Sequence, residues 1–285
     1  MGTKISEING IAIDQMTQSV STSLRYIVPT LIKPTYRASQ GGKDAQLDID
    51  VEYDDRTIIV HNARQHSEQA SVDTQGFQLL HFPTKLVNFH NFAQQRRRYE
   101  EELQELVMPT LGAKEILIFD HTFRSDSAEL RAQQNSREAT TVIHNDYTDW
   151  SARKRLMELV GFERALTREN QRYAIVNVWR SIKGVVKSSP IACCDAQSVN
   201  EKDIIPAQRL TNERLGELEL VNYNENHKWF YYPDLGYNEA ILIKTYDSDH
   251  KHHAKRSIHS AFELPKQSSF VPARESIESR MFVFF

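Results

Sequence analysis

The sequence predicts a mainly β protein, a sandwich or barrel supported by helices from its N-terminal part. Short segments of β-type composition dominate the chain after Tyr173, and turn signals such as Pro233-Asp234-Leu235-Gly236 separate them. The strands follow one another instead of alternating with helices, which disfavours a parallel α/β sheet. The expected strands are Ala174–Trp179, Pro190–Cys194, Glu217–Tyr223, Lys228–Tyr232, Ala240–Tyr246 and Glu278–Phe285.

The N-terminal part is expected to add a hairpin and a long helix. Asp48–Tyr53 alternates in polarity and Thr57–Val60 is rich in β-branched residues, so the two segments predict a hairpin that turns at Asp54-Asp55. Asn91–Val107 carries apolar residues at helical spacing with glutamates between them. Pro109 is expected to end this helix, because proline cannot donate a backbone hydrogen bond.

The middle of the chain combines a buried strand with two short helices. Glu115–Phe119 is apolar and predicts the strand, whereas Ser151–Leu159 and Glu163–Glu169 predict the helices. The last residues, Met281–Phe285, are strongly apolar, which is unusual for a free chain end. The final strand is therefore expected to lie inside a sheet.

The composition is ordinary for a globular protein, with 40% hydrophobic and 26% charged residues and a net charge of −3. We expect one domain over residues 1–285, in which residues 1–110 form an N-terminal extension with helices packed on a core of residues 111–285. No segment approaches the roughly 20 apolar residues of a membrane span, and Met1–Met16 has no apolar core of a signal peptide. A cytoplasmic location without a membrane partner is expected. The basic residues are scattered, which argues against nucleic acid as a partner. The adjacent Cys193 and Cys194 are expected to be buried thiols without a disulfide.

His144 and Asp146 form the centre of a candidate metal site. The β-branched Thr141-Val142-Ile143 predicts a strand leading into His144, and residues two apart in a strand point to the same face. Two histidines and one carboxylate form the facial triad that holds Fe(II) and leaves three coordination positions open. A histidine and an aspartate separated by one residue are weak support alone, because such triplets also occur in surface turns.

His259 is the preferred third ligand among 11 histidines. It lies between Ser257-Ile258 and Ser260-Ala261-Phe262, a mixed segment that can face the interior. His227, before an aromatic run, is a weaker candidate, and His121 is interpreted as a packed structural histidine. Three further histidines belong to a charged segment that is interpreted as a solvated loop: His250, His252 and His253.

Two arginines after His259 are candidates for binding the remote carboxylate of a 2-oxoglutarate cosubstrate. An arginine pairs with a carboxylate through two parallel hydrogen bonds, which suits a dry pocket. Arg274 and Arg280 share a face if they lie on one unbroken strand. Arg274 is preferred, and the alternative for either residue is an ion pair at the rim with Glu275 or Glu278.

Several blocks of the sequence, in order, resemble the CmcJ/AsaB-like hydroxylase/desaturase family, which is found in bacterial and fungal natural-product gene clusters. The resemblance extends from about Gly76 to the C-terminus, and one departure is Trp179-Arg180-Ser181 where the family usually has Trp-Arg-Pro. The blocks are Gly112–Ala113, Phe119–Arg124, Val142–Thr148, Asn177–Arg180, Asn226–Asp234, Glu239–Lys244, His259–Phe262 and Arg274–Arg280.

This resemblance implies a double-stranded β-helix core, a jelly-roll or cupin-like fold, and oxidation that depends on Fe(II) with 2-oxoglutarate and O2 as cosubstrates. Carried onto this chain, it makes His144, Asp146 and His259 the iron ligands and Arg274 the anchor of the cosubstrate.

We therefore expect a non-haem Fe(II)/2-oxoglutarate dioxygenase that hydroxylates, desaturates or otherwise oxidises a C–H bond of a small natural-product intermediate, releasing succinate and CO2. One alternative is a cupin-like metal-dependent isomerase or an oxidase that does not use 2-oxoglutarate, and Arg274 is the feature that separates it from the first reading. Another is a non-catalytic β-sandwich binding module. The expected partner is a small molecule, with a homodimer compatible with the sequence.

Overall fold

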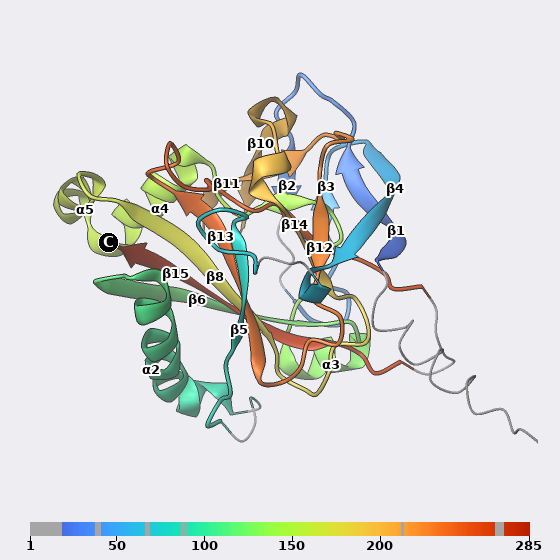
Figure 1. The fold of residues 1–285 in the computed structure, drawn as a ribbon, viewed down its shortest axis with the longest axis horizontal. Coiled ribbons are helices and arrows are strands. Elements are labelled where there is room, and N and C mark those ends of the chain that lie inside the picture. The colour runs from blue at the N-terminus through green and yellow to red at the C-terminus, as the bar shows by residue number, and fades with distance from the viewer. Residues whose placement is uncertain are drawn as a thin grey trace, which may run out of the picture.

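The computed structural model consists of two β-sheets with helices at one end and on one outer face (Figure 1). It describes residues 19–37, 41–65, 69–86, 89, 91–211, 214–265 and 271–285. The polar stretch Met1–Met16 lies outside the described residues.

The first sheet contains ten strands among the described residues and is antiparallel except at two pairs, β4–β12 and β2–β10. In spatial order these strands are β1 (Val20–Ile27), β4 (Tyr53–Asn62), β12 (Trp229–Tyr231), β9 (Ile191–Cys194), β14 (His259–Ala261), β7 (His144–Asn145), β11 (Leu215–Val221), β10 (Ile204–Leu210), β2 (Thr35–Arg37) and β3 (Asp48–Ile49).

The second sheet is antiparallel and contains five of the described strands. In spatial order they are β5 (Phe77–His81), β13 (Glu239–Asp247), β8 (Tyr173–Ser181), β15 (Glu275–Phe284) and β6 (Glu115–Ser125). The prediction that the final strand lies inside a sheet is confirmed, because β15 pairs with β8 on one side and β6 on the other. The six strands expected after Tyr173 are also confirmed, as β8, β9, β11, β12, β13 and β15.

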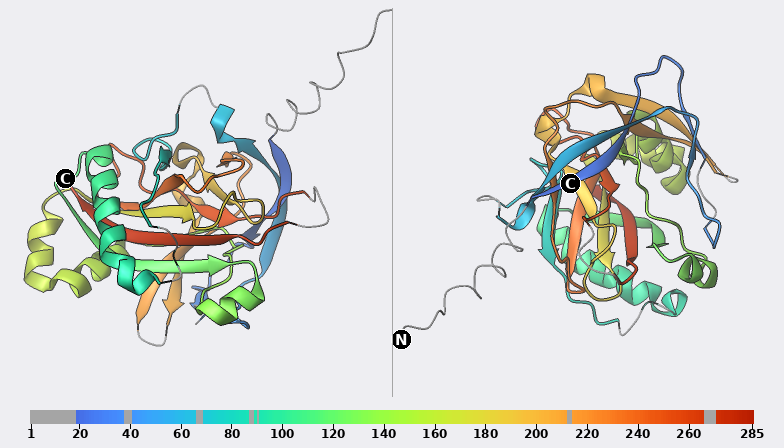
Figure 2. Two further views of the ribbon diagram at one scale, coloured as in Figure 1. Left: turned by 90° about the horizontal axis from the view of Figure 1, so that it is seen from below. Right: turned by 90° about the vertical axis from the view of Figure 1, so that its right-hand side faces the viewer.

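The inner faces of the two sheets pack against each other, which confirms the predicted mainly β fold with a double-stranded β-helix core (Figure 2). One apolar cluster joins Trp179 and Ile241 of the second sheet to Cys193 and Phe230 of the first. Both cysteines are free and buried on β9, as expected.

The predicted long helix is α2 (Phe92–Leu111), and it covers the outer face of the second sheet. Its apolar stripe of Tyr99, Leu103 and Val107 is fully buried in the cluster on that face. The expected end at Pro109 is wrong, since the helix continues to Leu111 and ends at Gly112, which has φ 65°. Only the carbonyl four residues before Pro109 loses its partner, and near an exposed helix end water can replace the missing donor.

The two predicted short helices are confirmed as α4 (Asp149–Val160) and α5 (Phe162–Glu169). The backbone N–H groups of Ser151 and Thr148 donate to each other's side-chain oxygens at the start of α4, and this reciprocal cap fixes the direction in which the chain leaves Asp146. The remaining short helices are α3 (Ala128–Gln134), η1 (Ala63–Gln65), η2 (Ala196–Ser198) and η3 (Glu201–Asp203).

The predicted hairpin at Asp54-Asp55 is wrong. Both aspartates lie inside β4, which pairs with β1, whereas β3 pairs with β2. Arg25 lies directly opposite Asp55 and contacts it at 2.8 Å, and Arg56 contacts Asp54 at 2.7 Å. The charge of Arg25 on the paired strand β1 stabilises in a strand aspartates that would otherwise favour a turn.

Residues 1–110 contribute five described strands as well as α2. Strands β1 to β4 belong to the first sheet and β5 to the second, so this part of the chain extends both sheets. None of the described helices combines the length and the apolar content that a membrane span needs.

Candidate metal centre

Strand β7 is short but positions the first two candidate ligands. It contains only His144 and Asn145, while Val142 makes an isolated bridge to Arg25, so the expected longer strand is interrupted. His144 pairs with Leu220 of β11 on one side and with His259 of β14 on the other. Asp146 follows the strand directly.

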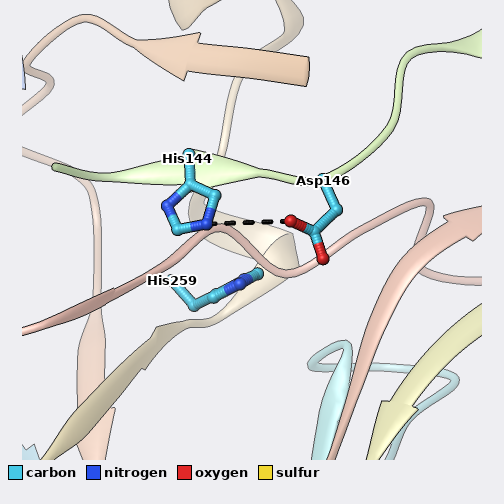
Figure 3. A group of neighbouring side chains, drawn as sticks. All are labelled: His144, Asp146 and His259. Atoms are coloured by element: carbon cyan, nitrogen blue, oxygen red, sulfur yellow. Dashed lines mark ion pairs between the residues drawn. The ribbon is translucent and has the colours of Figure 1, made fainter. Parts of the chain in front are cut away.

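The structure brings His144, Asp146 and His259 together (Figure 3). His259 lies directly opposite His144 in the β7–β14 pair, and the two ring centroids are 4.6 Å apart. One ligand atom from each of the three residues lies within 4.8 Å of the others, and His144 Nε2 is 3.8 Å from Asp146 Oδ1. Within the described ranges, this is the one group of this kind with metal-ligand geometry.

The other histidines considered from the sequence lie elsewhere. His121 contacts Ser279 at 2.8 Å and Glu100 at 3.1 Å, and its ring packs on Phe92 of α2, as expected of a structural histidine. His227 contacts the Tyr26 hydroxyl at 3.2 Å. In the charged loop, His252 pairs with Asp249 and His253 lies near Asp73.

Both candidate histidines have the tautomer that a metal requires. His144 Nδ1 lies 2.9 Å from the Val142 carbonyl, and His259 Nδ1 lies 3.0 Å from the Ser257 carbonyl. A carbonyl only accepts hydrogen bonds, so each Nδ1 carries a proton and Nε2 is left as the nitrogen that can bind a metal. Burial, reinforced by the neighbouring His259, lowers the pKa of His144 to about 3, so its imidazole is neutral at physiological pH.

Asp146 is held from the second sheet through one carboxylate oxygen. Its Oδ2 accepts hydrogen bonds from Asn177 Nδ2 at 2.7 Å and from Arg280 Nε at 3.0 Å. Burial opposes ionisation of Asp146, but Arg280, the two histidines and Asn177 together hold its pKa well below the usual value. The ionised carboxylate therefore turns Oδ1 towards His144.

All three side-chain nitrogens of Arg280 donate hydrogen bonds inside the protein. Besides Asp146, it donates from Nη1 to Asp120 at 2.6 Å and to Thr122 at 2.9 Å, and from Nη2 to Glu278 at 2.6 Å. Arg280 therefore lies beside the candidate ligands with four of its five N–H groups in use and three carboxylates already paired with it.

Arg274 is buried but largely unpaired. Its Nη1 donates to the Ser189 carbonyl at 2.6 Å, and its Nε lies 3.9 Å from Asp126. Nε and Nη2 have no hydrogen-bond partner among the described residues. The guanidinium lies 5.7 Å from the ring centre of Trp179, and burial lowers the pKa of Arg274 to about 10.

The sequence interpretation missed the polar residues that support this centre. Asn177 lies opposite Arg280 in the β8–β15 pair, and its Nδ2 also donates to Glu278 at 2.7 Å. Asn145 Nδ2 donates to the Tyr147 carbonyl, to Glu219 at 2.8 Å and to the Thr245 carbonyl. A signal was available in β8, where Asn177 interrupts an otherwise apolar run, because a polar residue is buried in such a strand only with partners.

Comparison with known proteins agrees with this geometry. A family model described as an oxidoreductase/YMDC permease-like domain matches residues 24–284. The hydroxylase/desaturase efuI of Hormonema carpetanum is 28% identical over 260 residues, which cover 82% of this chain and 85% of that protein. The hydroxylase/desaturase CTB9 of Cercospora beticola is 29% identical over 256 residues, covering 82% and 78%.

One solved structure, that of the iron and alpha-ketoglutarate-dependent endoperoxidase NvfI, shares the fold. It superposes with a TM-score of 0.81 at 23% identity and covers 93% of this chain and 97% of that one. Alpha-ketoglutarate is 2-oxoglutarate, the cosubstrate expected from the sequence. The chain belongs to the hydroxylase/desaturase family of iron- and α-ketoglutarate-dependent oxygenases.

Proposed function

We propose that this protein hydroxylates or desaturates a C–H bond of a small natural-product intermediate, using Fe(II), 2-oxoglutarate and O2. The observation that carries the proposal is the convergence of His144, Asp146 and His259 on one point between the sheets. Iron bound with the cosubstrate would supply the oxidant, and 2-oxoglutarate would leave as succinate and CO2.

In this proposal the protein provides the ligands in a ready state. The imidazole of His144 is neutral, His144 and His259 both direct Nδ1 to a carbonyl and present Nε2, and Asp146 presents an ionised oxygen. Two nitrogen ligands and one carboxylate are the donor set of a facial Fe(II) triad. The hydrogen bonds to Val142 and Ser257 orient the rings, as partners of ligating histidines commonly do.

Arg274 is the proposed anchor for the remote carboxylate of 2-oxoglutarate. It has two nitrogens without a hydrogen-bond partner among the described residues. Each side-chain nitrogen of Arg280, in contrast, already donates to Asp146, Asp120, Thr122 or Glu278. The one carboxylate that pairs with Arg274 among the described residues, Asp126, is 3.9 Å away, so this buried guanidinium gains from a closer bound carboxylate. This difference favours the use of 2-oxoglutarate over the cupin-like alternative.

The relatives support the reaction class through their names, which include hydroxylase/desaturase and, for phiK, alpha-ketoglutarate-dependent dioxygenase. We further infer a single catalytic domain over residues 1–285. In it, residues 111–285 supply every proposed ligand and anchor, and residues 1–110 form the extension.

Iron binding measured without oxygen tests the proposal. The wild-type protein should bind one Fe(II) per chain, and addition of 2-oxoglutarate should produce a weak visible charge-transfer band. Asp146→Ala should lose both the stoichiometric iron and the release of succinate from 2-oxoglutarate. Arg97→Met is a suitable control because its guanidinium is 92% exposed on α2, and it should behave as wild type. Normal iron binding by Asp146→Ala would rule out this ligand set.

A further inference from the structure

A group of arginines lies on the inner faces of both sheets beyond the metal centre. Arg209 of β10 lies opposite Gly216 of β11, and four residues further along β11 Leu220 lies opposite His144. Directly paired residues share a face, and every second residue returns to that face. Arg209 therefore points to the same side of the first sheet as His144. Its parallel partner Tyr36 is on that side as well.

The second sheet contributes two more arginines. Arg280, which contacts Asp146, lies opposite Asp120 on β6. Arg124 follows Asp120 by four residues in the same strand and therefore shares its face. Arg137 forms a parallel bridge with Arg124, which places it on this face too. The face carrying both arginines is the one from which Arg280 contacts Asp146.

These guanidinium groups have few partners. Arg124 donates to the Glu138 carbonyl at 2.9 Å and lies 3.9 Å from Glu278. The side chains of Arg137 and Arg209 make no hydrogen bond or ion pair with any part of the chain that the structure describes. Burial lowers the pKa of Arg137, and the charges of Arg124, Arg209 and Arg280 lower it further. Because the charge of Arg209 affects the pKa of Arg137, Arg209 of the first sheet lies close enough to the arginines beside the second sheet for their charges to interact.

Charge counting separates this group from the metal centre. Arg280 is paired with the carboxylates of Asp146, Asp120 and Glu278, which leaves two negative charges to balance a divalent iron. Beyond it, three arginines, Arg124, Arg137 and Arg209, have one further acidic residue beside them, Glu138, of which one oxygen is buried without a partner. Arg124 also lies 3.9 Å from Glu278, which is already counted with Arg280. The difference is two positive charges on half-buried side chains, which a bound anion would stabilise.

We propose that Arg124, Arg137 and Arg209, together with the Tyr36 hydroxyl, bind a carboxylate of the organic substrate beside the metal centre. The inference rests on the proposed function and narrows its substrate class to small carboxylic acids with an apolar body. The apolar body fits the surroundings, because Tyr36 and Leu218 belong to an apolar cluster that includes Val142, two residues before His144. Anchoring the acid group at the arginines holds the rest of the molecule in a fixed direction relative to the candidate ligands.

The subsite differs from the proposed cosubstrate anchor. Arg274 contacts Ser189, lies near Asp126 and faces the ring of Trp179. Arg124, Arg137 and Arg209 share none of these contacts. Two separate cationic positions allow 2-oxoglutarate and an acidic substrate to bind at the same time.

Calorimetric titration with matched acids and primary amides tests the proposal. The probes are 3-phenylpropanoic, naphthalene-2-carboxylic and octanoic acids and their amides, added without oxygen to the Fe(II)/2-oxoglutarate protein and, in parallel, to the metal-free protein. Each acid should bind at least about ten-fold more tightly than its amide, the gain expected from one charge-assisted pairing. Arg137→Met and Arg209→Met should each weaken acid binding about ten-fold and leave amide binding unchanged. Arg137→Lys should retain most of the preference, and Arg97→Met all of it.

Four outcomes decide the proposal. Equal affinity for acids and amides, including no measurable binding of either, overturns it, and so does unchanged acid affinity in both methionine variants. Loss of the 2-oxoglutarate charge-transfer band in Arg137→Met but not in Arg274→Met also overturns it, because the arginines would then hold the cosubstrate. If wild type forms no such band yet the metal-free protein keeps the acid preference and the variants lose it, the subsite stands and the proposed oxygenase function fails.

Discussion

Arg280 and Arg274 should show opposite effects when each is replaced by methionine. Arg280 is 7% exposed and is the shared cation of three carboxylates, whereas Arg274 is 4% exposed and has no carboxylate closer than 3.9 Å. The two residues are of one type, similarly buried and six positions apart. The comparison therefore isolates the effect of pairing.

The expected magnitudes follow from these contacts. Arg280→Met leaves Asp146, whose side chain is 14% exposed, without its cation, and leaves Glu278, 5% exposed, with only Arg124 at 3.9 Å. Breaking a buried ion pair costs about 3–5 kcal/mol, and the third partner, Asp120, adds little because its side chain is 43% exposed. Arg274→Met loses a hydrogen bond worth about 1 kcal/mol but also removes an unpaired buried charge, so the net change should be within about 1 kcal/mol.

Urea unfolding of the metal-free protein measures the stability difference, with Arg97→Met as the exposed control. Arg280→Met should unfold at clearly lower urea, and Arg274→Met close to wild type. Titration of the Fe(II) protein with 2-oxoglutarate should show the larger effect in Arg274→Met. Its affinity for 2-oxoglutarate should fall about 100-fold, because two charged hydrogen bonds to the carboxylate are lost. The reasoning is refuted if Arg274→Met loses as much stability as Arg280→Met, or if it binds 2-oxoglutarate normally.

Two further predictions concern the candidate histidines. The unfolded chain protonates His144 near pH 6.5, but the folded protein does not until about pH 3, so the metal-free protein should lose stability as pH falls through this range. In His144→Gln the unfolding free energy should fall less steeply with decreasing pH than in wild type. Between pH 6 and 4 the two slopes should differ by about 1.4 kcal/mol per pH unit. Urea titrations that give equal slopes for the two proteins would contradict this. Gly76 has φ +83°, and a Cβ there would lie 2.9 Å from Ser257 Cβ, beside the carbonyl that orients His259. Gly76→Ala should lose roughly 2 kcal/mol or more and weaken Fe(II) binding. Gly112→Ala, in a left-handed conformation with φ +65° and open space around it, should cost about 1 kcal/mol and leave iron affinity intact.

The sequence predicted the parts of this protein that depend on local patterns. The C-terminal strands, α2, α4 and α5 follow from periodicity, and the spacing of His144 and Asp146 follows from the two-residue repeat of a strand. The hairpin at Asp54-Asp55 failed because its alternative, pairing with Arg25 on β1, involves a partner 30 residues away. A local pattern that indicates a turn contains no information about a charged partner so far away in the sequence.

The division of roles between the arginines could not be predicted for the same reason. Arg274 and Arg280 look equivalent in sequence, since both are near β15 and flanked by acidic residues. The partners that distinguish them come from other elements, with Asp120 on β6 and Ser189 before β9. Strand β10 was also missed, because Pro206 interrupts its pattern, although its side chain is exposed and the strand continues past it.

The arrangement of the candidate ligands indicates which contact limits the formation of the metal centre. His144 and His259 are neighbours in one sheet and are brought together by the β7–β14 pairing itself. Asp146 lies beyond the end of β7 and is held by Asn177 and Arg280 from the other sheet. The packing of the two sheets therefore sets the position of the carboxylate, while the register of one sheet sets the histidines. Weakening the contact between the sheets should thus displace Asp146 first and leave a pair of histidines, a site with too few ligands to hold Fe(II) as a triad does.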